Sequence, residues 1–498
     1  MYGGSNPYNY LRHQHVKTLD VYKVLGVSLD SILKLVLEEV TPKPEEKKAL
    51  ERAVSDIIRK LLDVRDKHGW SYDVMHLGST ARDTWLSGSR DIDIFLAFPL
   101  SEDERTLEEV GVKAGIEVSE GRYELLYSSH PYVRIEHMGF EIDIVPCYKV
   151  SNASQLRSAV DRTQLHQRYL KEKLTPRLCG EIRLMKAFAK GIGVYGAETK
   201  TRGFSGYLLE LLVLYYGSFL EAVRAASRWK PPIIIDIERY YTPREAREVF
   251  DAPIIVVDPV DRRRNAAAAV GRQALSAFIA ASSVFLAKPS ILFFKPPQRR
   301  LPNEVSEHIA VVVFKLPKAP PDVQWSQLEK ACSKIRAYME EHGAQILGSG
   351  FWTDEVDTGA LAFKLASWQI PEARVHYGPF VWQREASMKF IERHLGREDT
   401  AEGPFIQDFR WVVVKKRESD VLKVLKRLLS DSSTMKSIGV PSRIAGSIEE
   451  GYKLFTEKNI LELKGTRLEA FLTKVIDRTP QYVRWGRRDL NPRPPALH

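Results

Sequence analysis

The sequence runs Asp91-Ile92-Asp93-Ile94-Phe95 at its most informative point. Side chains alternate across a β-strand, so residues two apart share a face. Asp91 and Asp93 are therefore expected on one face, while the apolar residues beside them help to fill a core. A second segment, Glu141-Ile142-Asp143-Ile144-Val145, adds Asp143 if its strand lies beside the first. The pattern predicts three carboxylates gathered at one place on a sheet.

Such a group of carboxylates indicates a metal site. Carboxylates that crowd together repel one another unless cations lie between them. Hard oxygen ligands suit Mg²⁺, which binds together with the phosphates of a substrate. Paired aspartates on a strand are more often solvated surface, so the residues around them must decide between the two interpretations.

The segment before the first strand favours the metal site. It reads His76-Leu77-Gly78-Ser79-Thr80-Ala81-Arg82, which is typical of a tight turn that leads into a helix. Gly78 permits close backbone approach, Ser79 is a good N-cap, and free N–H groups at a helix start attract phosphate. Arg82, one helical turn further on, is placed to reach the same anion. The order of these features predicts phosphoryl transfer.

In these features the chain resembles the nucleotidyltransferase superfamily of DNA polymerase beta type, whose signature is Gly-Ser, then Asp-X-Asp, then a third aspartate on a later strand. Further motifs narrow the resemblance to the archaeal, class I CCA-adding enzymes, which are tRNA nucleotidyltransferases. In chain order these motifs are Cys147-Tyr148, Ser158 to Thr163 with His166, Tyr195 to Glu198, Arg202 to Tyr207, Val257 to Asp261 with Arg264-Asn265, and Phe293 to Pro296. The resemblance weakens after Pro296.

The resemblance implies template-independent addition of CCA to the 3′ end of tRNA from CTP and ATP, with release of pyrophosphate. It implies that Asp91, Asp93 and Asp143 bind two Mg²⁺ ions, with Asp143 as the best candidate to activate the attacking hydroxyl. By the same resemblance, the residues that contact the nucleotide are Ser79, Arg82, His166, Lys186, Tyr195 and Arg264.

Three of these residues have ordinary alternatives outside the resemblance. His166 is then a hydrogen-bonded core or surface histidine, Lys186 the solvated side of its helix, and Arg264 a surface arginine. Within the resemblance, Arg264 helps to read the base. C and A carry an exocyclic amino donor where U and G carry a carbonyl acceptor. A guanidinium has donors only, so another group must supply the acceptor for that amino group.

Composition favours a nucleic-acid partner and a reducing compartment. The formal net charge is +10 over 498 residues, which favours a polyanionic partner, although a basic surface kept for solubility is the alternative. Three cysteines, odd in number and widely spaced, predict reduced thiols in the cytoplasm rather than disulfides or a zinc site. The most apolar segment, Tyr207 to Leu220, is shorter than the roughly 18 residues of a membrane span and contains Glu210. It predicts a buried helix and no membrane.

The expected fold class is a multidomain α/β protein of α+β type, with a polymerase-beta-like nucleotidyltransferase palm. The expected domains are an N-terminal extension (1–30), the catalytic domain (31–158), a helical nucleotide- and substrate-binding domain (159–295), an α+β tRNA-binding domain (296–470) and a tail without fixed structure (471–498). Periodicity predicts two helices between Asp30 and His68, one helix over Gly206–Trp229, and strands at Ile309–Phe314 and Arg410–Lys415.

The C-terminal domain and the basic linker before it are expected to hold the acceptor and T arms of tRNA. A homodimer is a further expectation. A poly(A) polymerase or another terminal RNA nucleotidyltransferase uses the same metal site and is the first alternative. A tRNA-binding module with an inactive transferase core is the alternative from a different class, and the intact aspartates argue against it.

Overall fold

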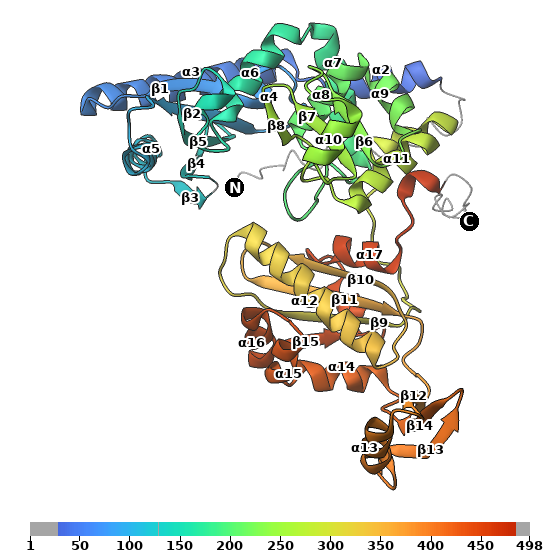
Figure 1. The fold of residues 1–498 in the computed structure, drawn as a ribbon. Coiled ribbons are helices and arrows are strands. Elements are labelled where there is room, and N and C mark those ends of the chain that lie inside the picture. Colours follow the sequence, from blue (N-terminus) through green and yellow to red (C-terminus); the bar gives the residue numbers. More distant parts are fainter. Residues whose placement is uncertain (1–27, 128, 485–498) are drawn as a thin grey trace, which may run out of the picture. The chain divides into compact units, whose positions relative to one another are not determined.

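The computed structural model describes residues 28–127 and 129–484 of the chain. They form two compact units (Figure 1). Unit 1 comprises the chain up to Pro297 and again from Pro480, and unit 2 comprises Gln298–Thr479. Most of the predicted extension and the end of the predicted tail, residues 1–27 and 485–498, lie outside the described residues. The mixture of helices and sheets in separate units confirms the predicted multidomain α+β class.

Unit 1 contains a five-stranded sheet that holds the three aspartates. Its strands lie in the order β1-β2-β5-β4-β3, with β2 and β5 parallel and the other neighbours antiparallel. The strands are β1 Asp73–Leu77, β2 Asp91–Phe98, β3 Tyr123–Tyr127, β4 Pro131–His137 and β5 Phe140–Tyr148. The helices around them are α2 Leu29–Val40, α3 Pro44–His68, α4 Gly78–Ala81 and α5 Glu104–Val118. The two helices predicted ahead of the sheet are confirmed.

One face of this sheet is apolar because α3 and α5 cover it. Ile92 and Ile94 of β2 and Ile144 of β5 are buried there among the side chains of both helices. Burial stabilises each of these side chains by roughly 1.5–3 kcal/mol. A slip of one residue would turn Asp93 into this core, so the isoleucines fix the register that leaves the aspartates on the other face.

The rest of unit 1 is mainly helical and encloses a core of phenylalanines. Its helices are α6 Arg162–Lys173, α7 Pro176–Gly191, α8 Gly206–Tyr216, α9 Phe219–Ala226, α10 Pro243–Val249 and α11 Arg272–Ala287. A small sheet has the order β6-β7-β8, with β6 Ile233–Asp236, β7 Ile254–Asp258 and β8 Asp261–Asn265. The ring of Phe188 lies at the centre of the core, within 6.0 Å of the rings of Phe219, Phe278, Phe285, Phe293 and Phe294.

The prediction of one helix from Gly206 to Trp229 is wrong. The first helix ends at Tyr216, because the next residue, Gly217, has a φ of 83°, a left-handed conformation that favours glycine, and Ser218 caps the second helix. The two helices, α8 and α9, meet at 94°. Among the described residues no single helix is long and apolar enough to cross a membrane, and these two reach that length only as a bent pair.

Unit 2 is an α+β unit with two sheets. The larger sheet has the order β10-β11-β9-β15, with β9 Ile309–Lys315, β10 Ile346–Thr353, β11 Thr358–Leu365 and β15 Tyr452–Phe455. The smaller has the order β12-β14-β13, with β12 Ala373–Phe380, β13 Thr400–Gln407 and β14 Arg410–Lys416. The helices are α12 Pro321–Glu341, α13 Arg384–His394, α14 Val421–Leu429, α15 Ser432–Ser437, α16 Ser442–Glu450 and α17 Glu469–Ile476. Helices α12, α14, α15 and α16 pack on one face of the larger sheet. Helix α17 packs on its other face.

Part of the predicted unstructured tail is folded. Helix α17 buries Leu472 against the larger sheet of unit 2. The short 3₁₀ helix Gln481–Val483 returns to unit 1, where the ring of Tyr482 stacks on Phe293 with centroids 4.6 Å apart. The prediction is wrong for these residues. Their apolar side chains, such as Leu472 and Tyr482, pack into hydrophobic cores although the surrounding sequence is basic and Pro-rich.

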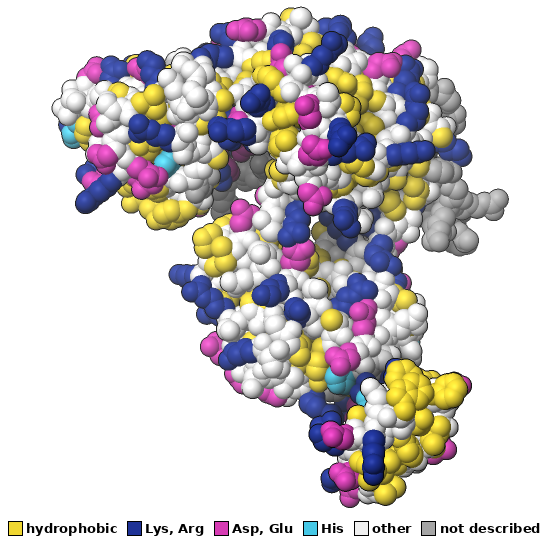
Figure 2. Space-filling model, in the orientation of Figure 1, with side chains coloured by type: hydrophobic (Ala, Val, Ile, Leu, Met, Phe, Trp, Pro, Cys, Tyr) yellow, Lys and Arg dark blue, Asp and Glu magenta, His cyan; other side chains and the backbone are white. Residues whose placement is uncertain are grey.

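The smaller sheet of unit 2 exposes large apolar side chains (Figure 2). Trp382 is 65% exposed and Phe409 70% exposed, and the ring of Trp382 stacks on Phe380 with centroids 4.7 Å apart. Exposed apolar groups that gather in this way mark interaction surfaces more often than single exposed residues do.

Candidate active site

A row of charged side chains crosses the face of the five-stranded sheet that lies opposite α3 and α5. Asp93 of β2 stands directly beside Asp143 of β5. Arg134 of β4 stands opposite Asp143, and Glu124 of β3 stands opposite Arg134. Asp91 lies two residues before Asp93, at the exposed start of β2. The register thus places the three aspartates on two neighbouring strands, which meets the condition under which the sequence predicted that they gather.

The turn after β1 lies against Asp93. Leu77 is the register partner of Asp93, and Gly78 follows it with a φ of 80°. A Cβ at residue 78 would lie 2.0 Å from Oδ2 of Asp93, so only glycine lets the carboxylate lie so close to the turn. Burial, together with the negative charges of Asp143 and Asp91, raises the pKa of Asp93 to about 6. The three carboxylates therefore share one electrostatic environment beside this turn.

The donor set at the turn fits a divalent cation. Three carboxylates supply hard oxygen ligands, and their mutual repulsion is relieved by positive charge. Among the described residues the ligand oxygens of the three aspartates do not lie within 4.8 Å of one another, and Arg134 holds both oxygens of Asp143. Nε of Arg134 lies 2.6 Å from Oδ1, and Nη2 lies 2.8 Å from Oδ2. Such a fork is the strongest geometry for an arginine–carboxylate pair.

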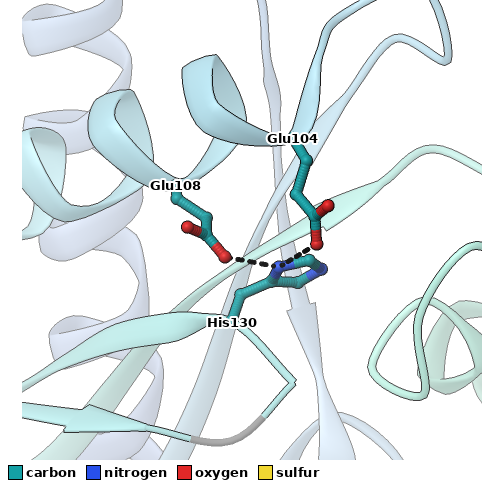
Figure 3. Close-up of side chains that lie close together, drawn as sticks. All are labelled: Glu104, Glu108 and His130. Atoms are coloured by element: carbon teal, nitrogen blue, oxygen red, sulfur yellow. Dashed lines mark hydrogen bonds and ion pairs between the residues drawn. The ribbon is translucent and has the colours of Figure 1, made fainter.

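Within the described ranges, the only three His, Cys, Asp or Glu side chains whose ligand atoms all lie within 4.8 Å of one another are Glu104, Glu108 and His130 (Figure 3). Nδ1 of the buried His130 lies 3.1 Å from Glu108 and 3.7 Å from Glu104. Both glutamates belong to α5, which covers the face opposite the aspartates. Nε2 of His130 is buried without a partner, whereas a metal-bound histidine normally donates its second ring N–H. We assign this group no metal.

Two predicted phosphate ligands, Arg82 and Lys186, meet at one buried carboxylate, that of Glu210 in α8. Nζ of Lys186 lies 2.8 Å from Oε1, and Nη2 of Arg82 lies 2.9 Å from Oε2. Thr84 donates to Oε1 at 2.5 Å, and Lys186 also donates to the backbone oxygen and the hydroxyl of Thr84. Lys186 is 1% exposed. The alternative that Lys186 is the solvated side of its helix is therefore wrong.

A second buried carboxylate, that of Asp258 at the end of β7, joins two other predicted residues. Its Oδ2 lies 2.9 Å from Nε2 of His166 and 2.7 Å from Nη1 of Arg264. Its Oδ1 accepts a hydrogen bond from the hydroxyl of Tyr207, whose ring stacks on His166 with centroids 3.7 Å apart. His166 and Arg264 are thus held as one group, and Arg264 is not an isolated surface arginine.

The last two predicted residues lie near these groups. Ser79 lies inside the short helix α4, whose N-cap is Leu77, so the prediction of a serine cap is wrong. Strand β1 ends at Leu77 and α4 begins at Gly78, so the last residue of the strand takes the cap position. Burial raises the pKa of Tyr195 to about 12, and the charges of Glu210 and Asp91 contribute after it. Tyr195 therefore lies within electrostatic reach of both Glu210 and Asp91.

Four residues of this arrangement were missed from the sequence. Glu210 had a visible signal, because it is an acid inside the most apolar segment of the chain. Asp258 and Tyr207 lie within quoted motifs but were given no role. Arg134 gave no signal, since a single arginine on a half-buried strand is common and its partner is set by strand pairing. The missed residues are the ones that hold the predicted residues in place.

Family models match three successive parts of the chain. A nucleotidyltransferase domain matches residues 57–166, the second domain of tRNA nucleotidyltransferases matches residues 180–295, and the C-terminal domain of CCA-adding enzymes matches residues 306–457. The first match contains all three aspartates and the Gly78 turn.

Similar proteins cover most of the chain. The CCA-adding enzyme of Pyrobaculum islandicum is 38% identical over 402 residues, which is 80% of this chain and 93% of that protein. The CCA-adding enzyme of Methanothermobacter thermautotrophicus is 35% identical over 429 residues, or 83% and 92%. Among solved structures, a cytoplasmic RNA terminal U-transferase matches with a TM-score of 0.41 and 16% identity, over 54% of this chain and 99% of that chain.

Proposed function

The chain belongs to the CCA-adding enzymes, and we propose that the aspartates at the Gly78 turn carry out the addition of C, C and A to the 3′ end of tRNA. In this reaction the 3′-hydroxyl of tRNA attacks the α-phosphate of CTP or ATP without a template, and pyrophosphate leaves. The observation that supports this assignment most is the register of Asp93 beside Asp143, at a turn where a Cβ would collide with the Asp93 carboxylate.

Nucleotidyltransferases of this superfamily use divalent metal ions, and we propose that Asp91, Asp93 and Asp143 hold two Mg²⁺ ions. When bound, such ions lower the pKa of the attacking hydroxyl and offset the charge of the leaving pyrophosphate. Asp91 and Asp93 share one strand and are assigned to the side of the site where the triphosphate of the nucleotide would bind. Asp143 lies on the parallel strand next to them and is assigned to the side of the tRNA hydroxyl.

We propose that Ser79, Tyr195 and His166 contact the sugar and phosphates of the nucleotide directly, and that Arg82 and Lys186 act mainly through their charges. Glu210 holds both cations inside unit 1. The charge of Arg82 reaches the metal-binding face, since it lowers the pKa of Asp93 against the effects of burial and of the neighbouring acids. A fixed positive charge beside the site favours a triphosphate at the moment when the leaving group gains charge.

We propose that Arg264 takes part in base selection. Its guanidinium supplies donors to the ring acceptors that C and A present, and the group that accepts from their amino donor comes from elsewhere. U or G would then leave a buried acceptor unmatched, which costs roughly 1–3 kcal/mol. The bond from Arg264 to the buried Asp258 supports this role, because it fixes the direction of the guanidinium.

We propose that unit 2 and the basic linker before it hold the acceptor and T arms of tRNA. All tRNAs receive the same end although their sequences differ, so recognition rests on helix shape, phosphates and 2′-hydroxyl groups. The three cysteines are free and buried, which supports the cytoplasm as the compartment. The homodimer stays a prediction, and the exposed apolar side chains of β12 to β14 are the surface that such a contact would bury.

Binding of tRNA is expected to weaken steeply with salt. Each phosphate that a lysine or arginine neutralises releases counterions, and six to ten such contacts lose roughly 10³- to 10⁵-fold in affinity between 50 and 200 mM salt. Fluorescence anisotropy of labelled tRNA at several KCl concentrations measures the slope. An affinity that does not change with salt would contradict the proposed basic tRNA surface.

Incubation with Mg²⁺, labelled CTP, ATP and tRNA that lacks its 3′ CCA is expected to extend the tRNA by C, C and A and no further. Sequencing of the product separates this outcome from a poly(A) polymerase, which would make a long homopolymer. A tRNA that already ends in CCA is the matched control and should stay unextended. Bound but unextended tRNA would point to the binding module instead.

A further inference from the structure

The row of charged side chains across the sheet consists of Asp93, Asp143, Arg134 and Glu124, and Arg134 is its one positive charge. The proposed reaction gives Arg134 no role. Cross-strand pairing aims its guanidinium at Asp143, and its two N–H groups occupy both carboxylate oxygens at 2.6 and 2.8 Å. Those oxygens are the ones that the proposed reaction needs as metal ligands. The arginine and a divalent cation therefore bind the same two atoms, and their like positive charges repel each other.

Arg134 also has acids on two other sides. Nη1 lies 3.8 Å from a carboxylate oxygen of Glu141, and Glu124 stands opposite Arg134 on β3. The side chain is 36% exposed, so it has room to turn. An arginine side chain changes partner by rotation about its own bonds, without movement of the strand. A guanidinium displaced from Asp143 could thus pair with Glu141 or Glu124, which lie next to it.

We propose that Arg134 is a positioning residue that holds the Asp143 carboxylate in the absence of a cation and exchanges it for a divalent cation when the site is loaded. The negative charges of Asp143 and Asp91 raise the pKa of Asp93, and the positive charges of Arg82 and Arg134 act against them. Arg134 compensates the charge of Asp143, which keeps the strands in register. The same contact lowers the affinity for the cation, because the cation must first displace it.

This inference rests on the proposed metal site. It assigns to Arg134 an effect on the affinity of that site for the divalent cation. Removal of Arg134 is expected to tighten cation binding, whereas removal of a ligand weakens it. A merely structural arginine would not produce this sign, since its loss would loosen the strands and weaken binding.

Binding of Mn²⁺ to the full chain, followed by electron paramagnetic resonance in the presence of CTP, tests the exchange without any turnover. Arg134→Gln is expected to bind Mn²⁺ about tenfold more tightly than the unaltered chain, since a neutral amide does not compete for the oxygens. Arg134→Lys keeps the charge but loses the fork and should fall between the two. Arg105→Gln is the matched control, because Arg105 pairs with Glu109 on the exposed side of α5, and it should leave Mn²⁺ binding unchanged.

Mn²⁺ affinity of Arg134→Gln that is equal to or weaker than that of the unaltered chain would overturn the inference, provided that circular dichroism and thermal unfolding show a folded protein. If Arg134→Gln does not fold, Arg134→Lys decides by the same criterion. The variants Asp93→Asn and Asp143→Asn separate the two failures. If both bind Mn²⁺ as the unaltered chain does, the proposed metal site itself is wrong. If both lose binding while the arginine variants do not tighten it, only the role of Arg134 is wrong.

Discussion

Asp93→Asn is expected to reduce the rate of CTP addition by about 10³-fold or more while tRNA binds almost as before. Asparagine has the shape of aspartate, so it still fits against Gly78, but it removes the negative charge that a cation needs. Loss of a single charge-stabilising group in an active site costs on the order of 10²- to 10³-fold in turnover, and a shared metal ligand belongs at the upper end. Single-turnover kinetics with saturating tRNA measure the rate.

Asp66→Asn is the matched control for this variant, because Asp66 lies at the exposed end of α3 and its side chain is 67% exposed. It should leave the rate of CTP addition and the affinity for tRNA unchanged. Near-normal turnover of Asp93→Asn would remove the basis of the assignment. An equal loss of tRNA affinity would show instead that the substitution disturbs the fold of the sheet.

The position of the aspartates was predictable because it depends on local patterns. Alternation over Asp91 to Phe95 predicted that the two aspartates share one face of the strand. The isoleucines between and after them predicted that the opposite face is buried. The structure adds that β2 and β5 are parallel neighbours, which puts Asp93 beside Asp143. The sequence could not predict that these strands are neighbours and only stated what would follow if they were. Strand order depends on contacts between residues far apart in the chain.

The partners of the predicted residues were not predictable, because they come from distant parts of the chain. Glu210 lies 128 residues from Arg82 and 126 from Thr84. Strand β8 was also missed, because its residues Asp261 to Asn265 are all polar and carry no strand pattern. Asn265 holds that strand in place, since its side chain bonds the backbone of Val256 and Ile254. Such contacts leave no local pattern in the sequence.

Glu210→Gln is expected to lower the free energy of unfolding by about 3–5 kcal/mol. The substitution keeps the size of the side chain but leaves Lys186 and Arg82 as buried cations without a counter-charge, and breaking a buried pair costs about this much. Guanidinium titration followed by circular dichroism measures the change. Glu221→Gln is the matched control, because Glu221 pairs with Arg224 on the surface of α9 with its side chain 53% exposed. Such exposed pairs contribute about 0–1 kcal/mol.

The pH dependence of this loss has a definite sign. Burial alone would raise the pKa of Glu210, but the charges of Lys186 and Arg82 lower it to about 2, below the ordinary 4.5. A carboxyl group whose pKa is lowered on folding stabilises the protein above the ordinary pKa, and this contribution is lost as the pH falls towards the folded value. The difference in stability between the unaltered chain and Glu210→Gln should therefore be constant from pH 7 to about 5 and shrink below it. A difference that does not change down to pH 3 would show that the cations do not stabilise the charge of Glu210.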